Sequence, residues 1–242
     1  MSGGVYGGDE VGALVFDVGH HSFRVGYAGE EFPKADVPSH VGVVEKVIAE
    51  NGDSMEVDEN KRNSSEAQKK IKKYSFGTAN ISAPRPDMEI ETFLKDGMVE
   101  DWDMFEAMLD HMYANCLFSE SKYHPVLFSE PAWNTKSKRE KLIEVMFEKY
   151  NAPAFFVCKN AVLAAFANGR SSGLVLDSGS TYTSAVPVYD GYCLTQAIVK
   201  SPLGGNMVSE QCKLMLQEQG IEVVPTYKIA SKVVFRITLV RK

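Results

Sequence analysis

Apolar and polar residues alternate around a polar turn in two separate stretches of the chain. The first stretch, Ala13–Gly29, runs through apolar residues into Asp17, turns, and continues with alternating strand-forming residues. The second, Gly173–Gly191, does the same around Asp177. Alternation on both sides of a short turn predicts a β-hairpin. The sequence therefore predicts two hairpins, far apart along the chain.

The turns of the two hairpins match in chemical type, VFDVG at Val15–Gly19 and VLDSG at Val175–Gly179. Such a turn aims backbone N–H groups at one point, which suits a phosphate, and a nearby carboxylate can hold a hydrated Mg²⁺. For one hairpin alone, an Asp-x-Gly turn selected for its backbone angles is the plainer interpretation. The repeat favours a duplicated architecture in which each half offers one turn to a shared ligand.

Helical and strand periodicities alternate through the rest of the chain, which predicts βαβ units and a parallel or mixed sheet. The 101–117 helix has Asp101 as its N-cap, and the 160–168 helix stops at Gly169. The expected elements are helices over Asp101–Leu117, Thr135–Tyr150, Asn160–Asn168 and Asn206–Gln219, and strands over Val41–Ile48, Pro125–Ser129, Ala154–Cys158 and Ile221–Val224. The apolar face of the 135–150 helix is expected to include Leu142, Ile143, Met146, Phe147 and Tyr150.

The segment Glu45–Asn80 differs in composition, because acidic residues are followed by basic ones and large apolar residues are scarce. It is predicted to be an exposed, mobile insertion, with paired strands at its flanks as an open alternative. The KKIKK run at Lys69–Lys73 is either a nuclear-import or acidic-partner patch or a solvated loop. The terminal segment Ser231–Lys242 is β-prone and would form an edge strand without a following partner.

Composition narrows the class of protein. The chain has 242 residues, enough for one large or two small domains, and 44% of them are hydrophobic. A net charge of −6 argues against a broad nucleic-acid footprint and against binding to an anionic membrane. The four cysteines lie far apart without metal-ligand spacing, which favours reduced intracellular thiols. Neither a signal peptide nor a membrane-spanning stretch is expected.

Several segments together resemble actin and the actin-related proteins, collinearly over roughly residues 9–230. They are the Asp17 hairpin, GMVEDWDMFE at Gly97–Glu106, HPVLFSEPAWN at His124–Asn134, REKLIEVMFEKYNAPAFF at Arg139–Phe156, FANGR at Phe166–Arg170 and LDSGS at Leu176–Ser180. The wording of Gly97–Asp103 and Trp133–Phe156 is most similar to the branch that includes actin-like protein 6, the actin-related subunits of SWI/SNF-type chromatin remodellers.

The resemblance implies an α/β fold of the actin-like ATPase, ribonuclease H-like type, with a first lobe and an incomplete second lobe around a nucleotide cleft. Residues 1–38 and 93–167 would form the first-lobe base, and residues 39–92 a small insertion subdomain, partly disordered over 45–80. Residues 168–230 would begin the second lobe, and residues 231–242 are a divergent tail. The expected product is a form truncated at the C-terminus.

The resemblance also implies a cofactor site for ATP with Mg²⁺. The residues implied to bind the nucleotide are Asp17, Gly19 and Arg24 on the first loop, Asp177, Ser178 and Gly179 on the second, and Gly205 on the adenosine side. Asp17 and Asp177 would hold the metal through water. Catalytic residues are not expected.

Departures from the actin pattern explain why catalytic residues are not expected. His20 and His21 replace small residues in the first turn, which predicts a reshaped loop, and Ser180 and Thr181 replace an Asp–Gly pair. Asn160 is one methylene shorter than the Gln that positions the attacking water in actin, and misplacement by about 1 Å can cost on the order of 100-fold in rate. Ser184 replaces a His that assists the same water.

The resulting hypothesis is a non-catalytic scaffold subunit of nuclear chromatin-remodelling and histone acetyltransferase complexes. Its expected partners are nuclear actin, the helical segment of a remodeller ATPase subunit and other remodeller subunits. Filament formation, sequence-specific nucleic-acid binding and membrane binding are not expected. The alternatives are a nucleotide-binding ATPase of the actin superfold with weak or no hydrolysis, and an unstable product without independent function.

Overall fold

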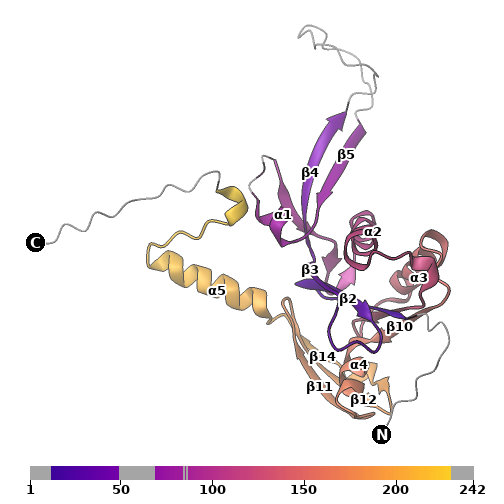
Figure 1. Cartoon of the computed structure of the whole chain (residues 1–242). Coiled ribbons are helices and arrows are strands. Elements are labelled where there is room, and N and C mark those ends of the chain that lie inside the picture. The colour runs from indigo at the N-terminus through magenta and orange to yellow at the C-terminus, as the bar shows by residue number, and fades with distance from the viewer. Residues whose placement is uncertain (1–11, 49–68, 84, 86, 230–242) are drawn as a thin grey trace, which may run out of the picture. The chain divides into compact units, whose positions relative to one another are not determined.

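The computed structural model describes residues 12–48, 69–83, 85 and 87–229. The chain divides into two compact units, and Figure 1 labels their elements. The first unit contains Met1–His40 and Thr92–Val223, and the second contains Val41–Glu91 and Val224–Lys242.

A five-stranded mixed sheet in the order β10-β9-β1-β2-β3 is the centre of the first unit. Its strands are β1 (Leu14–Val18), β2 (Ser22–Tyr27), β3 (Ala35–Pro38), β9 (Val126–Glu130) and β10 (Phe155–Lys159). The predicted first hairpin is confirmed, because β1 and β2 pair antiparallel. β9 runs parallel to both β1 and β10, as expected for βαβ units.

Helices α2 (Trp102–His111) and α3 (Lys136–Glu144) begin directly after residues whose side chains cap them, Asp101 and Thr135. Asp101 accepts a hydrogen bond from the backbone N–H of Met104 at 3.0 Å, so its predicted role as N-cap is confirmed. Each helix continues into a wider π-helical turn, over Met112–Leu117 and Val145–Lys149. These turns were not predicted, since the sequence pattern indicated two uninterrupted α-helices.

The core of the sheet is aromatic. Phe16 and Phe128 stack with their ring centroids 4.7 Å apart, and Phe23 stacks on Phe105 of α2 at 6.2 Å. All four side chains are at most 1% exposed. Burial of this much apolar surface is the main stabilising contribution that the structure shows for this unit.

One part of the predicted apolar face of the 135–150 helix is wrong. Leu142, Met146 and Tyr150 are buried, but Ile143 and Phe147 are 36% and 44% exposed. Val145 is buried instead. The π-helical turn has more residues per turn than an α-helix, so it changes which residues after Glu144 face the core.

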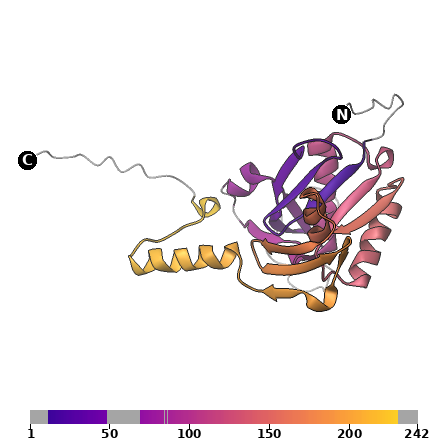
Figure 2. The ribbon, with the colours of Figure 1, turned by 90° about the horizontal axis from the view of Figure 1, so that it is seen from below.

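A second sheet is built around the second predicted hairpin, which is also confirmed. β11 (Gly173–Ser178) and β12 (Thr183–Tyr189) pair antiparallel, and β12 also pairs with β13 (Tyr192–Cys193) and β14 (Val199–Ser201). Helix α4 (Asn160–Ala167) packs its small residues against this sheet. The cluster that results contains Ala132, Ala161, Val162, Ala165, Val186 and Val188. Figure 2 shows the sheet and α4 from below.

Helix α5 (Gly205–Glu218) follows, and none of its residues is buried. The strand predicted over Ile221–Val224 is wrong, because this segment has no regular secondary structure. Its apolar side chains, among them Ile221 and Val224, are 44% to 49% exposed. An apolar run becomes a strand only where a neighbouring strand is available to pair with it, and the described residues provide none here.

The second unit contains a three-stranded sheet in the order β5-β4-β6, with β4 (His40–Ile48), β5 (Lys69–Ser75), β6 (Glu89–Thr92) and the short helix α1 (Thr78–Ser82). The alternative of paired strands at the flanks of the 45–80 insertion is confirmed by the β4–β5 pairing. The solvated-loop interpretation of KKIKK is wrong, because Lys69–Lys73 lies within β5. Residues 49–68 and the predicted edge strand Ser231–Lys242 lie outside the described residues.

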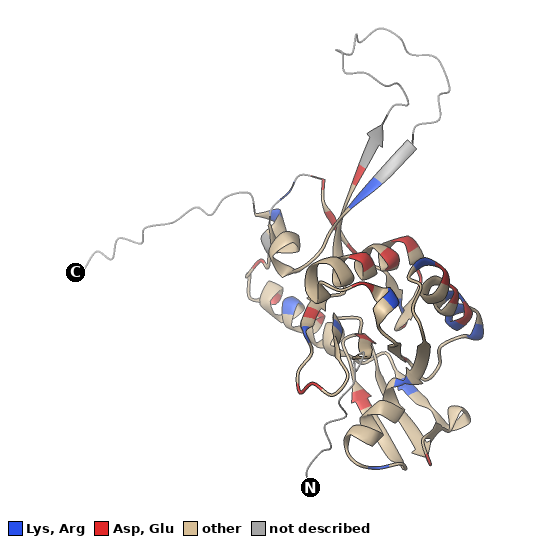
Figure 3. Cartoon of the chain, turned by 45° about the vertical axis from the view of Figure 1, so that its right-hand side comes forward, with Lys and Arg blue, Asp and Glu red and all other residues tan. Residues whose placement is uncertain are grey.

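Charged side chains are distributed unevenly over the first unit. Helix α2 carries acidic residues and helix α3 carries both basic and acidic ones, whereas the β11–β14 sheet carries few charged residues (Figure 3). None of the described helices combines the length and the apolar character that a membrane span requires.

Candidate functional site

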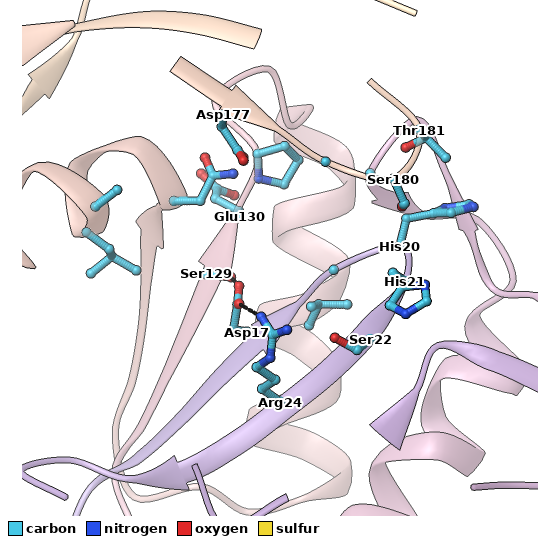
Figure 4. A pocket seen from close by; sticks show the side chains of 18 of the residues that line it. Asp17, His20, His21, Ser22, Arg24, Ser129, Glu130, Asp177, Ser180 and Thr181 are labelled. Carbon is cyan, nitrogen blue, oxygen red and sulfur yellow. Dashed lines mark hydrogen bonds and ion pairs between the residues drawn. The ribbon is translucent and has the colours of Figure 1, made fainter. Parts of the chain in front are cut away.

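The turns of the two hairpins line one cavity of about 440 Å³ within the first unit. The first turn contributes residues between Asp17 and Arg24, and the second contributes residues between Asp177 and Tyr182. The end of β9 and the start of α4 complete the wall. Figure 4 shows the side chains that point toward this cavity from both hairpins. Asp17 and Asp177 therefore share a cavity, as the duplicated pattern led us to expect.

The backbone of the two turns has the same hydrogen bond. The N–H of Gly19 donates to the carbonyl of Ser22 at 3.0 Å, and the N–H of Gly179 donates to the carbonyl of Tyr182 at 2.9 Å. A Cβ on Gly19 would lie 2.9 Å from that Ser22 oxygen, so a larger residue would have to displace the turn. The sequence repeat thus corresponds to a structural repeat at the level of single hydrogen bonds.

Asp17 and Arg24 lie opposite each other on β1 and β2. Asp17 accepts a hydrogen bond from the hydroxyl of Ser129 at 2.5 Å, and its carboxylate is 3.8 Å from the Arg24 guanidinium. Arg24 also donates to Asp36 at 2.9 Å. That hydrogen bond raises the pKa of Arg24 and lowers the pKa of Asp36. Arg24 is therefore held as a permanent cation beside the cavity.

Asp177 differs from Asp17 in its bonding. Its side chain is exposed, and it makes no hydrogen bond or ion pair with any residue that the structure describes. A free carboxylate facing a bonded one across a cavity suits a hydrated cation. Among the described residues, no group of three or more His, Cys, Asp or Glu side chains could hold a metal directly. The residues present therefore fit Mg²⁺ held through water and phosphate oxygens, not in a protein cage.

The other predicted binding residues separate into two groups. Gly19, Arg24 and Gly179 line the cavity with the two aspartates. Ser178 does not line the cavity. Its hydroxyl is hydrogen-bonded to that of Thr183 at 2.9 Å. Gly205 does not line the cavity either. Its N–H donates to the carbonyl of Gly179 at 2.9 Å. These two residues are thus bonded to the second hairpin and are not part of the cavity wall.

Asn160 and Ser184, the two residues expected to weaken hydrolysis, differ in their position relative to the cavity. Asn160 lines the cavity, and its side-chain oxygen accepts a hydrogen bond from the N–H of Ala161 at 2.8 Å, at the start of α4. Ser184 is only 2% exposed and is not part of the cavity wall.

A group of four residues near the second turn was not predicted. The Trp133 ring meets Tyr182 edge to face at 4.8 Å, and the Lys200 ammonium lies over both rings, 4.5 and 5.0 Å from their centroids. Lys200 is paired with the carboxylate of Asp96, whose backbone carbonyl accepts a hydrogen bond from the Trp133 indole at 3.0 Å. We call this group the Lys200 clamp; it holds Tyr182 on the cavity wall.

Tyr182 is a neutral phenol in this setting. Burial raises its pKa to about 12, with smaller contributions from Asp177, Asp96 and Asp17. The sequence offered only a weak signal for the Lys200 clamp. Aromatic residues follow each strand end, at Trp133 after β9 and Tyr182 after β11, but they are far apart in sequence.

Glu130, at the end of β9, is a further cavity residue that was not predicted. It is 5% exposed and accepts hydrogen bonds from Arg139 at 3.0 Å and from Asn134 at 2.9 Å. A buried carboxylate with this pairing is structural: it ties the end of β9 to the start of α3.

Comparison with known proteins agrees with this architecture. The family model described as Actin matches residues 8–239. The chain is 43% identical over 233 residues to actin-related protein 4 of Arabidopsis thaliana, which covers 94% of this chain and 53% of that protein. It is 39% identical over 229 residues to actin-related protein 4 of Yarrowia lipolytica, covering 94% of this chain and 50% of that protein. It is 38% identical over 238 residues to actin-related protein 4 of Oryza sativa subsp. indica, covering 94% of this chain and 53% of that protein.

The chain thus spans about half the length of these curated relatives. Their names do not support the narrower prediction of the actin-like protein 6 branch. The paired hairpins around a shared cavity, the mixed α/β sheets and the match over almost the whole sequence lead to one conclusion. The chain belongs to the actin family and has its α/β, actin-like ATPase fold.

Proposed function

We propose that this chain is a non-catalytic actin-related subunit of nuclear chromatin-remodelling and histone acetyltransferase complexes. Family membership and the resemblance described above support the choice of complex. The absence of catalysis is supported by the cavity. Asn160 and Ser184 stand at the two positions whose side chains act on the attacking water in actin, as the resemblance implies. The amide oxygen of Asn160 is bonded to its own helix, and Ser184 is buried outside the cavity wall.

The nucleotide has a structural role in this proposal. Arg24 and the backbone N–H groups of the two turns would bind phosphate, and Asp17 and Asp177 would hold Mg²⁺ through water. A bound ion of this kind supplies charge neutralisation for the phosphates. ATP would then connect the two hairpins without being hydrolysed. Free energy of binding that is realised only in the folded state stabilises the fold by mass action.

The expected partners are nuclear actin, the helical segment of a remodeller ATPase subunit and other subunits of the same complexes, and the expected location is the nucleus. A segment of this kind binds as a helix in an apolar groove. Filament formation is not expected. The second candidate function is an ATPase of the actin superfold. The observation that favours it is the Asp177 carboxylate on the cavity wall, which has no hydrogen bond or ion pair with any described residue.

Two measurements test the proposal. Purification of the tagged chain from nuclei should recover actin and a remodeller ATPase subunit; recovery of neither would reject the scaffold role. Phosphate release by the purified chain with Mg-ATP should not exceed the protein-free rate.

A phosphate release that disappears in Asp177→Asn but persists in Asp190→Asn would establish the ATPase instead. Asp190 is a suitable control because it lies at the far end of the same hairpin. It has a φ of 46°, a conformation that asparagine also tolerates.

A further inference from the structure

Three histidines gather around the first turn. His20 and His21 belong to the turn and line the cavity, and His40 lies where β3 leads into β4. The rings of His20 and His40 meet edge to face with their centroids 5.8 Å apart. The hydroxyl of Ser39, next to His40, donates to the carbonyl of Gly19 at 2.5 Å, which fastens this segment to the turn. In Figure 4, His20 lies beside Ser180 and Thr181 of the second turn.

Two polar atoms in this place have no partner. Nδ1 of His20 and the hydroxyl oxygen of Thr181 are buried without a hydrogen bond among the described residues. Both residues line the cavity, one from each hairpin turn. Buried polar groups are almost always satisfied, so each exception calls for an explanation. Two exceptions on facing turns of one cavity point to a polar ligand that both turns contact.

The electrostatic setting indicates the charge of that ligand. Burial lowers the pKa of His20, and His40 and His21 lower it further. Burial and His21 also lower the pKa of His40. The groups acting on His20 are thus only other imidazoles; neither Asp17 nor Asp177 contributes, and Ser180 and Thr181 are neutral. Asp36 interacts with His21, and it is already bonded to Arg24. Among the described residues, no carboxylate is therefore close enough to His20 to act as the counter-anion of an imidazolium there.

We propose that His20, supported by His40, binds an oxyanion in its protonated form, so that anion binding in the cavity takes up a proton from solvent. The ligand class is a phosphate group, free or at the end of a nucleotide. The bound anion supplies the negative charge that stabilises the imidazolium, and the imidazolium N–H donates to the anion. No covalent bond forms or breaks. This inference rests on the proposed function only in placing a phosphate in the cavity, and it does not depend on membership of a complex.

Sulfate is the suitable first probe, because its charge does not change over the pH range of interest. Its affinity for the purified chain is measured from NMR shifts of the histidine ring protons in a series of titrations. We expect binding to be severalfold tighter at about pH 6 than at about pH 8. A rise of about one unit in the pKa of His20 gives a limit of about tenfold, which is reached only at a pH below the pKa of His20 in the unbound chain. His20→Gln should abolish this pH dependence.

The matched control is His111→Gln. Burial lowers the pKa of His111 as well, but this residue lies on α2 and does not line the cavity. The pH dependence should persist in this variant. If His20→Gln does not fold, the His20 resonance in the unsubstituted chain gives the answer, because its pKa must rise when sulfate is added.

Sulfate binding with the same affinity at both pH values, or a pH dependence that survives His20→Gln, would overturn the inference while leaving anion binding as such intact. Absence of sulfate and of nucleotide binding at every pH would overturn both the inference and the nucleotide part of the proposed function. Competition identifies the source of the phosphate. Displacement of sulfate by ATP at concentrations where inorganic phosphate fails indicates a nucleotide, and equal displacement by both indicates free phosphate.

Discussion

The two hairpins have the same turn but different surroundings. β1 has neighbours on both sides, β2 and β9, and its residues Leu14 and Phe16 are fully buried. Among the described strands, β11 pairs with β12 alone, and its residues Leu174 and Leu176 are 69% and 73% exposed. The local sequence therefore determines the turn and the register, whereas the stability of each hairpin depends on what packs against it.

The largest effect should come from the matched pair Phe16→Ala and Leu176→Ala, which occupy equivalent positions before the two aspartates. Phe16→Ala removes a ring that contacts Phe23, Tyr113 and Phe128, and should lower the free energy of unfolding by about 3–5 kcal/mol. Leu176→Ala should lower it by less than about 1 kcal/mol. Urea denaturation measures both, and equal effects would refute the distinction between the hairpins.

The next effect concerns the Lys200 clamp, which holds the second turn. Trp133→Ala removes the contacts of this ring with Tyr182 and Lys200 and the hydrogen bond to Asp96. The expected loss is about 1–2 kcal/mol. Hydrogen exchange should accelerate at residues 178–182 and stay unchanged at residues 18–23.

Tyr192→Ala is the control for the Lys200 clamp, because this aromatic residue of the same sheet is 78% exposed. It should leave exchange in both turns unaltered. Equal acceleration of both turns in Trp133→Ala would show that the clamp acts on the cavity as a whole.

These contrasts also show which features of the structure can be predicted from the sequence. Both hairpins, the cap at Asp101 and the βαβ alternation follow from local patterns, because turn chemistry and periodicity are short-range properties. The bonds that hold residues in and beside the cavity do not follow from local patterns. Ser129 reaches Asp17 across 112 positions, and Lys200 reaches Asp96 across 104. Only the packing of separate elements brings these residues together, as it also decides that Ile221–Val224 is not a strand.

The two cavity aspartates give a smaller and equally direct contrast. Asp17→Asn weakens the bond to Ser129 and the ion pair with Arg24; because the Asp17 and Arg24 side chains are 51% and 48% exposed, solvent screening limits the loss to about 0.5–1 kcal/mol. Asp177→Asn should change stability by less than about 0.5 kcal/mol, since its carboxylate has no partner among the described residues. Thermal melts at low ionic strength compare the two. A larger loss in Asp177→Asn would reveal a bond that the structure does not contain.

The smallest expected effect is a dependence on pH that belongs to the first hairpin alone. His20 and His40 have pKa values below the ordinary 6.5, so the unfolded chain binds more protons than the folded one. Their contribution to stability is complete above about pH 6.5 and is lost as the pH falls through the lower pKa values of the folded state. The second hairpin, Gly173–Gly191, contains no histidine. Hydrogen exchange at about pH 5.5, with intrinsic rates corrected for pH, should therefore show faster opening at residues 18–23 than at 178–182. His20→Gln should reduce this difference, because only the contribution of His40 remains, and added sulfate should reduce it in the unsubstituted chain. If both turns open equally with acid, the histidines do not control the first turn.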